Sequence, residues 1–238
     1  SPRLDGAGSD YSAAVIASAI EAEALELWKN VAGFMSADPE VVPNARLIPA
    51  LSYEEAAELA YFGSKILHPR TVDPLRRRGI KIKIRHIQHL EAPGSVISSK
   101  TPVPEHIIKS VAHNAEIGIL KIYSSAVGAR PGILARIASQ LAKNGINIKS
   151  VVTSQTGISL LLDSKDMEDS YQALKALKPK PYSRIERLEH IALIGIVGQG
   201  LFQRKGIAAK CFTAVAKAGV NIEMISFGPA RAAFYFLV

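Results

Sequence analysis

The stretch Gly132-Ile-Leu-Ala-Arg-Ile-Ala-Ser-Gln-Leu-Ala-Lys-Asn-Gly-Ile-Asn-Ile148 recurs later in the chain as Gly206-Ile-Ala-Ala-Lys-Cys-Phe-Thr-Ala-Val-Ala-Lys-Ala-Gly-Val-Asn-Ile222. The identical pairs are Gly132/Gly206, Ile133/Ile207, Ala135/Ala209, Ala142/Ala216, Lys143/Lys217, Gly145/Gly219, Asn147/Asn221 and Ile148/Ile222. Such self-similarity indicates that one structural unit is present twice, which sets the fold class before any single element is assigned.

Within the first copy, Ile133, Ile137 and Leu141 recur every four residues, the spacing of an amphipathic helix with one apolar face. Gly145 follows this run, where a helix commonly ends on a left-handed residue without a Cβ atom. Apolar and polar residues then alternate over 146–149, which predicts a half-buried strand.

Around the repeated helix, residues 117–123 and 158–162 have the composition of strands, and residues 166–177 that of a helix. The order strand, helix, strand, strand, helix predicts a small α+β sandwich of the split βαβ type. The second copy begins with an expected strand at 191–197, and the chain stops at 234–238, so we expect this second unit to be incomplete.

The composition limits the class of protein. A chain of 238 residues with 48% hydrophobic content has room for more than one packed domain. No apolar run approaches the roughly 18 residues needed to span a bilayer. The single cysteine, Cys211, excludes an internal disulfide and fits a reducing, cytoplasmic compartment, where we expect it to be a core residue. The absence of an initial Met leads us to expect part of a longer protein.

The net charge of +8 suits nucleic acid, but also polyphosphate or carboxylate ligands. The densest basic run is 76–78, followed by lysines and an arginine that alternate with isoleucines over 80–85. This pattern is typical of a helix end and a strand with one solvated face. No aromatic residues interleave with these charges, so a nucleic-acid-binding module is weakly supported.

The N-terminal region reads as alternating strands and helices, an α/β layer. A glycine-containing loop at 5–9 leads into a helix at 10–20, where backbone N–H groups either hold an anion or simply form a turn capped by Ser9. Ser52 and Glu55 have the spacing of a capping box at the start of a helix over 53–62. We expect further strands at 24–28, 80–85 and 95–97, and a linker at 100–105.

Several motifs, taken in order, make the chain resemble the aspartate kinases. They are Gly8-Ser9-Asp10-Tyr11-Ser12-Ala13, residues 27–33, Ala37-Asp38-Pro39, residues 42–46, residues 52–63 with 65–70, and residues 91–94. The duplicated unit resembles the paired ACT domains of that family, in which the second ACT unit is inserted into the first and the chain then returns to complete the first. We expect that return to be absent here. The resemblance implies an α/β fold: residues 1–105 form the C-terminal part of an amino-acid kinase domain, 106–189 a first ACT domain (βαββαβ, ferredoxin-like) and 190–238 a second, incomplete one.

By this resemblance, the intact enzyme transfers the γ-phosphoryl group of ATP, with Mg²⁺, to the β-carboxylate of L-aspartate. The reaction opens lysine, threonine and methionine biosynthesis, and no tightly bound cofactor is expected. Ser9 and Asp10 match catalytic positions. The nucleotide-binding positions are Lys29, Asn30, Gly33, Asp38 and Lys65. By spacing alone Lys65 is better explained as a cation at a helix C-terminus; the flanking motif reverses that preference.

Three departures weaken the case for activity. The family usually has Arg where Gly6 stands, an acidic residue at Asn30, and often Arg at Glu40. No Lys-Phe-Gly-Gly-like segment is present, although the family begins its kinase domain with one. We therefore predict that the chain alone is inactive, and a non-catalytic, amino-acid-binding regulatory subunit of an aspartate kinase remains the alternative.

ACT units typically bind an amino-acid effector at a dimer interface, against the loop before the first helix, so we expect a homodimer. The matching residues here are Val127, Arg130, Gly132, Ile133, Leu134, Asn147, Ile148, Thr153, Ser154 and Gln155. On spacing alone Asn147 is equally well explained as a turn residue. Lys149 stands where lysine-sensing relatives are often acidic, which favours threonine or another neutral effector over lysine. The histidines have no metal-ligand spacing, so we expect no metal site.

Overall fold

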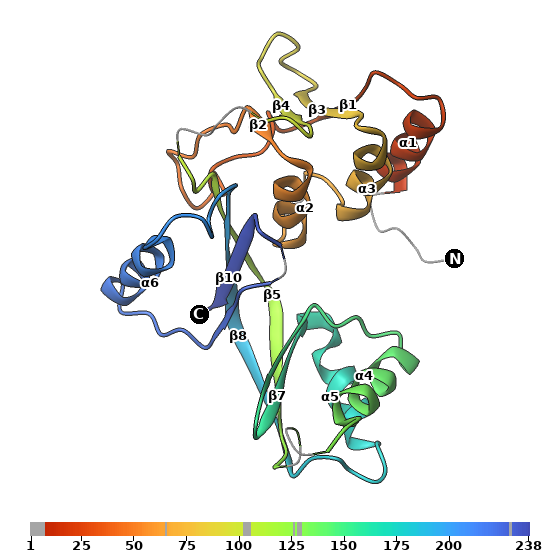
Figure 1. Ribbon diagram of the computed structural model, residues 1–238, viewed down its shortest axis with the longest axis vertical. Coiled ribbons are helices and arrows are strands. Elements are labelled where there is room, and N and C mark those ends of the chain that lie inside the picture. The colour runs from red at the N-terminus through yellow and green to blue at the C-terminus, as the bar shows by residue number, and fades with distance from the viewer. Residues whose placement is uncertain (1–7, 65, 102–105, 126, 128–129, 229) are drawn as a thin grey trace. The chain divides into compact units, whose positions relative to one another are not determined.

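The computed structural model describes residues 8–64, 66–101, 106–125, 127, 130–228 and 230–238 (Figure 1). The chain forms two compact units. The first comprises residues 1–113 together with 194–238, and the second comprises residues 114–193. Two long strands, β5 (Ser110–Tyr123) and β8 (Arg184–Val197), each run across the boundary between these units in sequence. Each unit is described separately below.

The N-terminal part of the first unit is built on a four-stranded sheet with the order β1-β3-β4-β2. Its strands are β1 (Ala24–Lys29), β2 (Ala50–Leu51), β3 (Lys81–His86) and β4 (Ser95–Ile97). The β1/β3 and β2/β4 pairs are parallel, and β3/β4 is antiparallel. Along β3, Ile82 and Ile84 are fully buried whereas Lys81 is exposed, so the alternation in sequence becomes one buried face.

Three helices accompany this sheet: α1 (Gly8–Ala19), α2 (Tyr53–Tyr61) and α3 (Pro69–Arg78). The predicted capping box of α2 is confirmed, because the Ser52 hydroxyl accepts from the Glu55 N–H and the Glu55 carboxylate accepts from the Ser52 N–H. α3 ends at Gly79, which has a φ of 69° in the left-handed region, and this agrees with the helix end indicated by the basic run 76–78.

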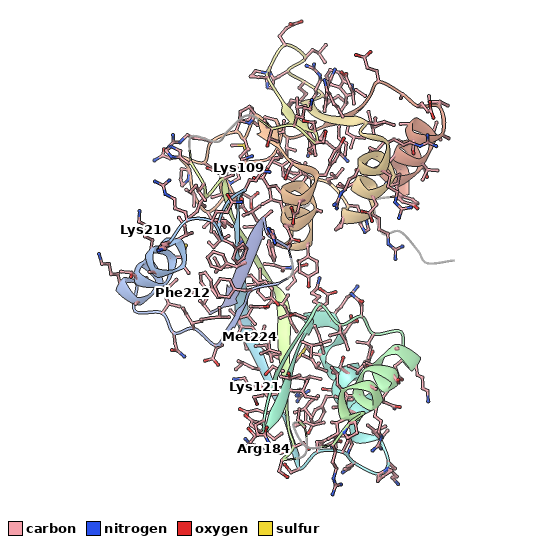
Figure 2. All side chains as sticks on the ribbon, in the orientation of Figure 1. Lys109, Lys121, Arg184, Lys210, Phe212 and Met224 are labelled. Carbon is pink, nitrogen blue, oxygen red and sulfur yellow. The ribbon has the colours of Figure 1, made fainter. Side chains whose placement is uncertain are left out.

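The rest of the first unit belongs to the second repeat. It contains the end of β8, α6 (Ile207–Lys217), β9 (Met224–Ser226) and β10 (Ala233–Leu237), with the strand order β8-β10-β9. Its core joins Ile196, Leu201, Phe234 and Phe236. Phe212 of α6, labelled in Figure 2, contacts the rings of Phe234 and Phe236 edge-on, at centroid distances of 6.3 and 5.5 Å.

The order of insertion differs from the one that the resemblance implies. Ile107 and Ile108, which precede the first repeat, pack against the core of the second, and the Lys109 N–H donates to the Val197 carbonyl. Residues 114–193 therefore form the continuous unit that interrupts the other, and not the reverse. The division into 1–105, 106–189 and 190–238 stays a prediction.

The second compact unit has its strands in the order β6-β7-β5, with antiparallel pairs throughout. Its further elements are α4 (Ile133–Lys143), β6 (Ser150–Ser154), β7 (Gly157–Asp163), a 3₁₀ turn (Ser164–Asp166) and α5 (Met167–Lys175). Both helices cover one face of the strands and share a core that includes Leu120, Ile137, Leu141, Leu160 and Leu174. The predicted fold class, an α/β kinase-type region followed by ACT-type units, is confirmed.

One predicted strand, over 146–149, is wrong: the strand begins at Ser150. The reason lies in the end of α4. The Ile146 N–H donates to the Leu141 carbonyl and the Gly145 N–H to the Ala142 carbonyl, the pair of bonds that closes a helix on a left-handed glycine. Because the Ile146 N–H is used by the helix and its side chain enters the core, the alternating residues here form a connection.

Candidate functional site

The structure brings together one predicted catalytic residue and one predicted nucleotide-binding residue. Asp10 lies in the first turn of α1, and Lys29 is the last residue of β1. The Lys29 ammonium is 2.6 Å from an Asp10 carboxylate oxygen, and the two side chains are 26% and 12% exposed. The pair therefore lies where the carboxyl end of a parallel strand meets a helix N-terminus, a usual location of ligand sites in α/β folds. Ser9 is exposed beside it.

In the loop after β1, Gly33 is explained by packing. It is buried with a φ of 148°, and a Cβ atom there would lie 2.4 Å from the Ser95 hydroxyl oxygen. That hydroxyl accepts from the Phe34 N–H at 2.9 Å and donates to the Ile48 carbonyl at 2.6 Å. A larger side chain at Gly33 would break this buried network. Its role in nucleotide binding stays a prediction.

Asp38 has a turn-forming role in the same loop. Its carboxylate accepts from the Glu40 N–H at 2.9 Å, and its carbonyl accepts from the N–H groups of Val41 and Val42. Asn30 is exposed and carries no charge. Lys65 and Gly6 lie outside the described residues. Among the residues that are described, no cluster of three His, Cys, Asp or Glu side chains is arranged to bind a metal ion.

The predicted effector loop leads into α4. Gly132 precedes the helix with a φ of 89°, Ile133 is buried in the core of its unit, and Leu134 is 40% exposed. The first N–H groups of a helix have no partner within it, so this end offers donors to a carboxylate. Val127 packs against the same core, and Arg130 is exposed.

The remaining predicted effector residues fall into two groups. Asn147 is exposed and Ile148 is half-buried against the core, in the connection after α4. Thr153, Ser154 and Gln155 are exposed at the end of β6. Thr153 and Ser154 line a hollow of about 230 Å³ together with Lys121, Tyr123 and neighbouring residues of β5 and β7. The lining of this hollow does not include Asn147 or the residues at the start of α4.

Lys149 has a partner that the sequence did not indicate. Its ammonium lies 3.1 Å from an Asp163 carboxylate oxygen, and the two side chains are 18% and 31% exposed. This ion pair offsets much of the positive charge at Lys149. The repulsion that we expected to disfavour a lysine effector is correspondingly weaker.

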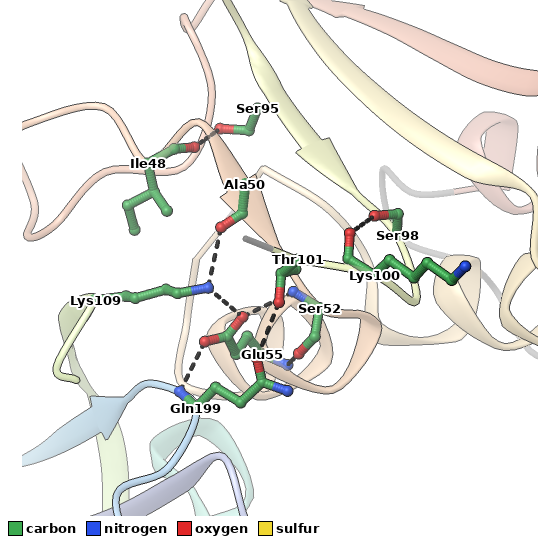
Figure 3. A network of polar contacts seen from close by, with 10 residues as sticks. All are labelled: Ile48, Ala50, Ser52, Glu55, Ser95, Ser98, Lys100, Thr101, Lys109 and Gln199. Atoms are coloured by element: carbon green, nitrogen blue, oxygen red, sulfur yellow. Dashed lines mark hydrogen bonds and ion pairs between the residues drawn. The ribbon is translucent and has the colours of Figure 1, made fainter. Parts of the chain in front are cut away.

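Sequence reasoning missed a buried polar network in the first unit (Figure 3). Glu55, identified only as a capping residue, is fully buried and pairs with the Lys109 ammonium at 2.8 Å. Its other oxygen accepts from the Gln199 N–H at 2.8 Å. The partners lie far apart in the sequence, and no periodic pattern connects them.

Comparison with known proteins gives these features a context. The amino acid kinase family model matches residues 4–86, and ACT domain models match residues 113–176 and 194–238. A bifunctional aspartokinase/homoserine dehydrogenase from Haemophilus influenzae is 34% identical over 93% of this chain, which covers 28% of that relative.

Solved structures of aspartate kinases are also similar to this chain. The chain superimposes on the aspartate kinase of Clostridium acetobutylicum with a TM-score of 0.87 and 28% identity, covering 98% of this chain and 54% of that one. E. coli aspartokinase III in complex with aspartate and ADP gives a TM-score of 0.84 and 30% identity, covering 97% and 52%. The same enzyme in complex with lysine and aspartate gives 0.80 at the same identity and coverage. The chain thus spans roughly half of these enzymes, and less of the bifunctional relative.

Proposed function

Over nearly its whole length this chain corresponds to the amino-acid kinase and ACT regions of aspartokinases, and we propose that it serves an aspartate kinase as its nucleotide-side and regulatory region. An enzyme containing it transfers the γ-phosphoryl group of ATP to the β-carboxylate of L-aspartate, giving 4-phospho-L-aspartate. The observation that carries the proposal is the Asp10–Lys29 pair at the carboxyl end of β1, within the region that matches the kinase family.

Phosphoryl transfer requires positioning of the two substrates and cations near the transferred oxygens, with little covalent participation by the protein. Lys29 supplies one cation, held in place by Asp10, and its ammonium has further donors to offer a phosphate oxygen. Lys65 is proposed as a second cation. The described acidic residues do not form a metal cluster, and Asp10 is already paired, so no step is assigned to a protein-held Mg²⁺.

Nucleotide binding is testable through the only tryptophan, Trp28, which precedes Lys29 and is 41% exposed. Titration with ATP should change Trp28 fluorescence, and Lys29→Met should weaken binding by roughly tenfold, the effect of losing one charge-assisted contact. Arg78→Met, which removes another ion-paired cation at the end of α3, should leave the affinity unchanged. Equal weakening in both variants would contradict a specific role for Lys29. Coupled measurement of ADP release should detect no aspartate-dependent turnover by this chain alone.

We further propose that an amino acid binds the first ACT unit, with its carboxylate at the N–H groups of Ile133 and Leu134 and its amino group at Asn147 and Ile148. The lysine complex of E. coli aspartokinase III supports an amino-acid effector. Lys149 still favours a neutral effector such as threonine, although its pairing with Asp163 reduces that preference. As part of the same proposal, the protein forms a homodimer through its ACT units. Sedimentation velocity tests this dimer.

The repeat offers a matched control for the effector site. Isothermal titration should give tighter binding of L-threonine than of L-lysine, and Asn147→Ala should weaken it by about tenfold, as expected for one lost polar contact. Asn221→Ala, the same change at the equivalent position of the second repeat, should have no effect. Binding that survives Asn147→Ala but not Asn221→Ala would move the site to the second repeat.

A non-catalytic regulatory subunit remains a second candidate. The specific observation in its favour is that Asn30 and Glu40 differ in charge from the residues that aspartate kinases usually have at these positions. If ATP fails to perturb Trp28 while an amino acid still binds, this second candidate is preferred.

A further inference from the structure

Helix α2 contacts the second repeat at both of its ends. We propose that α2, held by the buried carboxylate of Glu55, couples the loop before α6 (residues 198–206) to the kinase-type region. This coupling is additional to the proposed function. It rests on that proposal only in treating the N-terminal sheet and its helices as a kinase-type region.

Both oxygens of the Glu55 carboxylate are in use (Figure 3). One accepts from the Ser52 N–H at 2.7 Å and from the Lys109 ammonium at 2.8 Å. The other accepts from the Gln199 N–H at 2.8 Å. Glu55 is thus at once the capping residue of α2 and a ligand of the loop before α6.

Lys109 extends the network to the sheet. Its side chain is only 9% exposed, and its ammonium also donates to the Ala50 carbonyl of β2 at 3.1 Å. A second contact joins the loop before α6 to the linker: the Thr101 hydroxyl donates to the Gln199 side-chain oxygen at 2.9 Å. One buried ion pair therefore joins β2, α2 and the segment that leads into the repeats.

Further contacts show that α2 and the second repeat are fitted to one another. The Glu54 carboxylate accepts from the Arg231 N–H at 3.0 Å. At the opposite end of the helix, Phe62 is 1% exposed, and its ring centroid lies 5.7 Å from that of Tyr235 in β10. A Cβ atom at Gly195 of β8 would approach the Phe62 ring to 2.5 Å, so the strand meets the ring closely only because this residue is glycine.

The repeat shows what is special about this loop. By the alignment of the two copies, Gln199 corresponds to Ser125, which precedes α4 and is exposed. The loop before α6 thus already holds a carboxylate, that of Glu55, on a backbone N–H. An amino acid approaching that N–H would have to displace a buried, ion-paired carboxylate. The second repeat is therefore suited to transmit a change in its loop to α2, and the proposed effector site belongs to the first repeat.

Because the ion pair is buried, we expect the loop before α6 and α2 to be either fully bonded or separated, with few intermediate arrangements. While Glu55, Lys109 and Gln199 are all bonded, their charges and N–H groups are satisfied; displacing the loop leaves a buried carboxylate short of a donor, which is strongly unfavourable. Because the same carboxylate caps α2, we expect a loop movement that breaks this contact to shift or fray the start of α2.

The test introduces backbone strain into the loop before α6 and measures the effect on the local stability of α2. Gly200 in the loop has a φ of 86°, and the nearest atom to an added Cβ is 3.9 Å away, so Gly200→Ala strains only the local backbone. Gly219, after α6, has a φ of 70° with nothing within 4 Å of an added Cβ, so Gly219→Ala is a matched control at the far end of the same helix. Hydrogen exchange is measured for the amides of residues 56–62 in the full chain.

Gly200→Ala should accelerate exchange in α2 by about tenfold, the scale of strain from a left-handed alanine, and Gly219→Ala by less than about twofold. In a Glu55→Met/Lys109→Met background, which removes both charges and the acceptor of the Gln199 N–H, Gly200→Ala should cause no further acceleration. Equal effects of the two glycine variants, no effect of Gly200→Ala, or acceleration that persists without the ion pair would each overturn the proposal. Neither effector nor ATP is needed, so a failed effector or ATP titration would count only against the proposed function.

Discussion

The two repeats share eight of the 17 residues in their helix segments, 132–148 and 206–222, but their helices bury very different numbers of side chains. Helix α4 of the first repeat buries three apolar side chains, whereas α6 of the second, all of which the structure describes, buries none fully. The pairs at these positions are Ile133/Ile207, Ile137/Cys211 and Leu141/Val215. Part of the difference is side-chain size. The rest is context, because α4 also packs beside α5, to which Gln140 donates a hydrogen bond at the Ala173 carbonyl.

The faces of β5 and β8 that point away from α4 and α6 show the reverse contrast. At Gly195 the second repeat receives the Phe62 ring of α2. The equivalent residue of the first repeat is Lys121, which lines the hollow of about 230 Å³. The second repeat is therefore completed by the kinase-type region, and the first by its own second helix. A repeat in sequence thus does not imply two independent copies of one folding unit.

The largest expected effect is on the helix cores. Leu141→Ala removes a fully buried side chain and should lower the free energy of unfolding of the first repeat by about 2–5 kcal/mol. Val215→Ala, at the equivalent and only partly buried position, should lower that of the second by roughly 1 kcal/mol or less. Native-state hydrogen exchange in increasing urea reports each unit separately.

The isoleucine pair controls for the different residue types. Ile133→Ala and Ile207→Ala make the same change at equivalent positions, of which the first is 7% exposed and the second only partly buried. The first should again be the more destabilising. Equal losses at both positions would show that α6 is packed as tightly as α4, and would break the comparison.

A smaller effect is expected where α5 covers β5. A Cβ atom at Gly118 would lie 2.7 Å from the Met167 sulfur, whereas the equivalent residue of the second repeat is already Ala192. Gly118→Ala should therefore destabilise the first repeat by about 1–3 kcal/mol, toward the lower end because methionine is flexible. Ala192→Gly should cost at most about 1 kcal/mol, through backbone entropy.

A double-mutant cycle identifies the cause of that loss. In a Met167→Ala background, Gly118→Ala should be much less destabilising, because the clashing atoms are gone. Additive effects of the two substitutions, measured by urea unfolding, would show that the strain at Gly118 has another origin.

The smallest effect concerns Cys211, the counterpart of Ile137. Partial burial raises the pKa of the Cys211 thiol, so at pH 8 less of it is the reactive thiolate than in an exposed cysteine. Its reaction with a disulfide reagent should be a few-fold slower than in the urea-unfolded chain, and should accelerate as the pH rises through the elevated pKa. A rate equal to that of the unfolded chain would mean that α6 barely protects its inner face.

The local features of this protein were predictable because they depend on neighbouring residues. The capping box of α2, the left-handed glycine after α3 and the apolar stripe of α4 each follow from residues within one or two turns. The prediction of a strand at 146–149 was wrong for an equally local reason. The alternation of apolar and polar residues does not show that the Ile146 N–H is already bonded within the end of the helix. Among the site residues, Asp10 and Lys29 were both identified, but their ion pair was not.

The sequence by itself determined the duplication, the α/β and α+β character of its parts and the ends of most helices, because periodicity and capping are short-range signals. Only the tertiary structure decided that the first repeat interrupts the second, that Lys149 is paired with Asp163, and that Glu55 joins α2 to the loop before α6. Each of these depends on residues distant in the chain. A buried charge is satisfied by whatever partner the fold brings within 3 Å or so, and that choice leaves no pattern in the order of the residues.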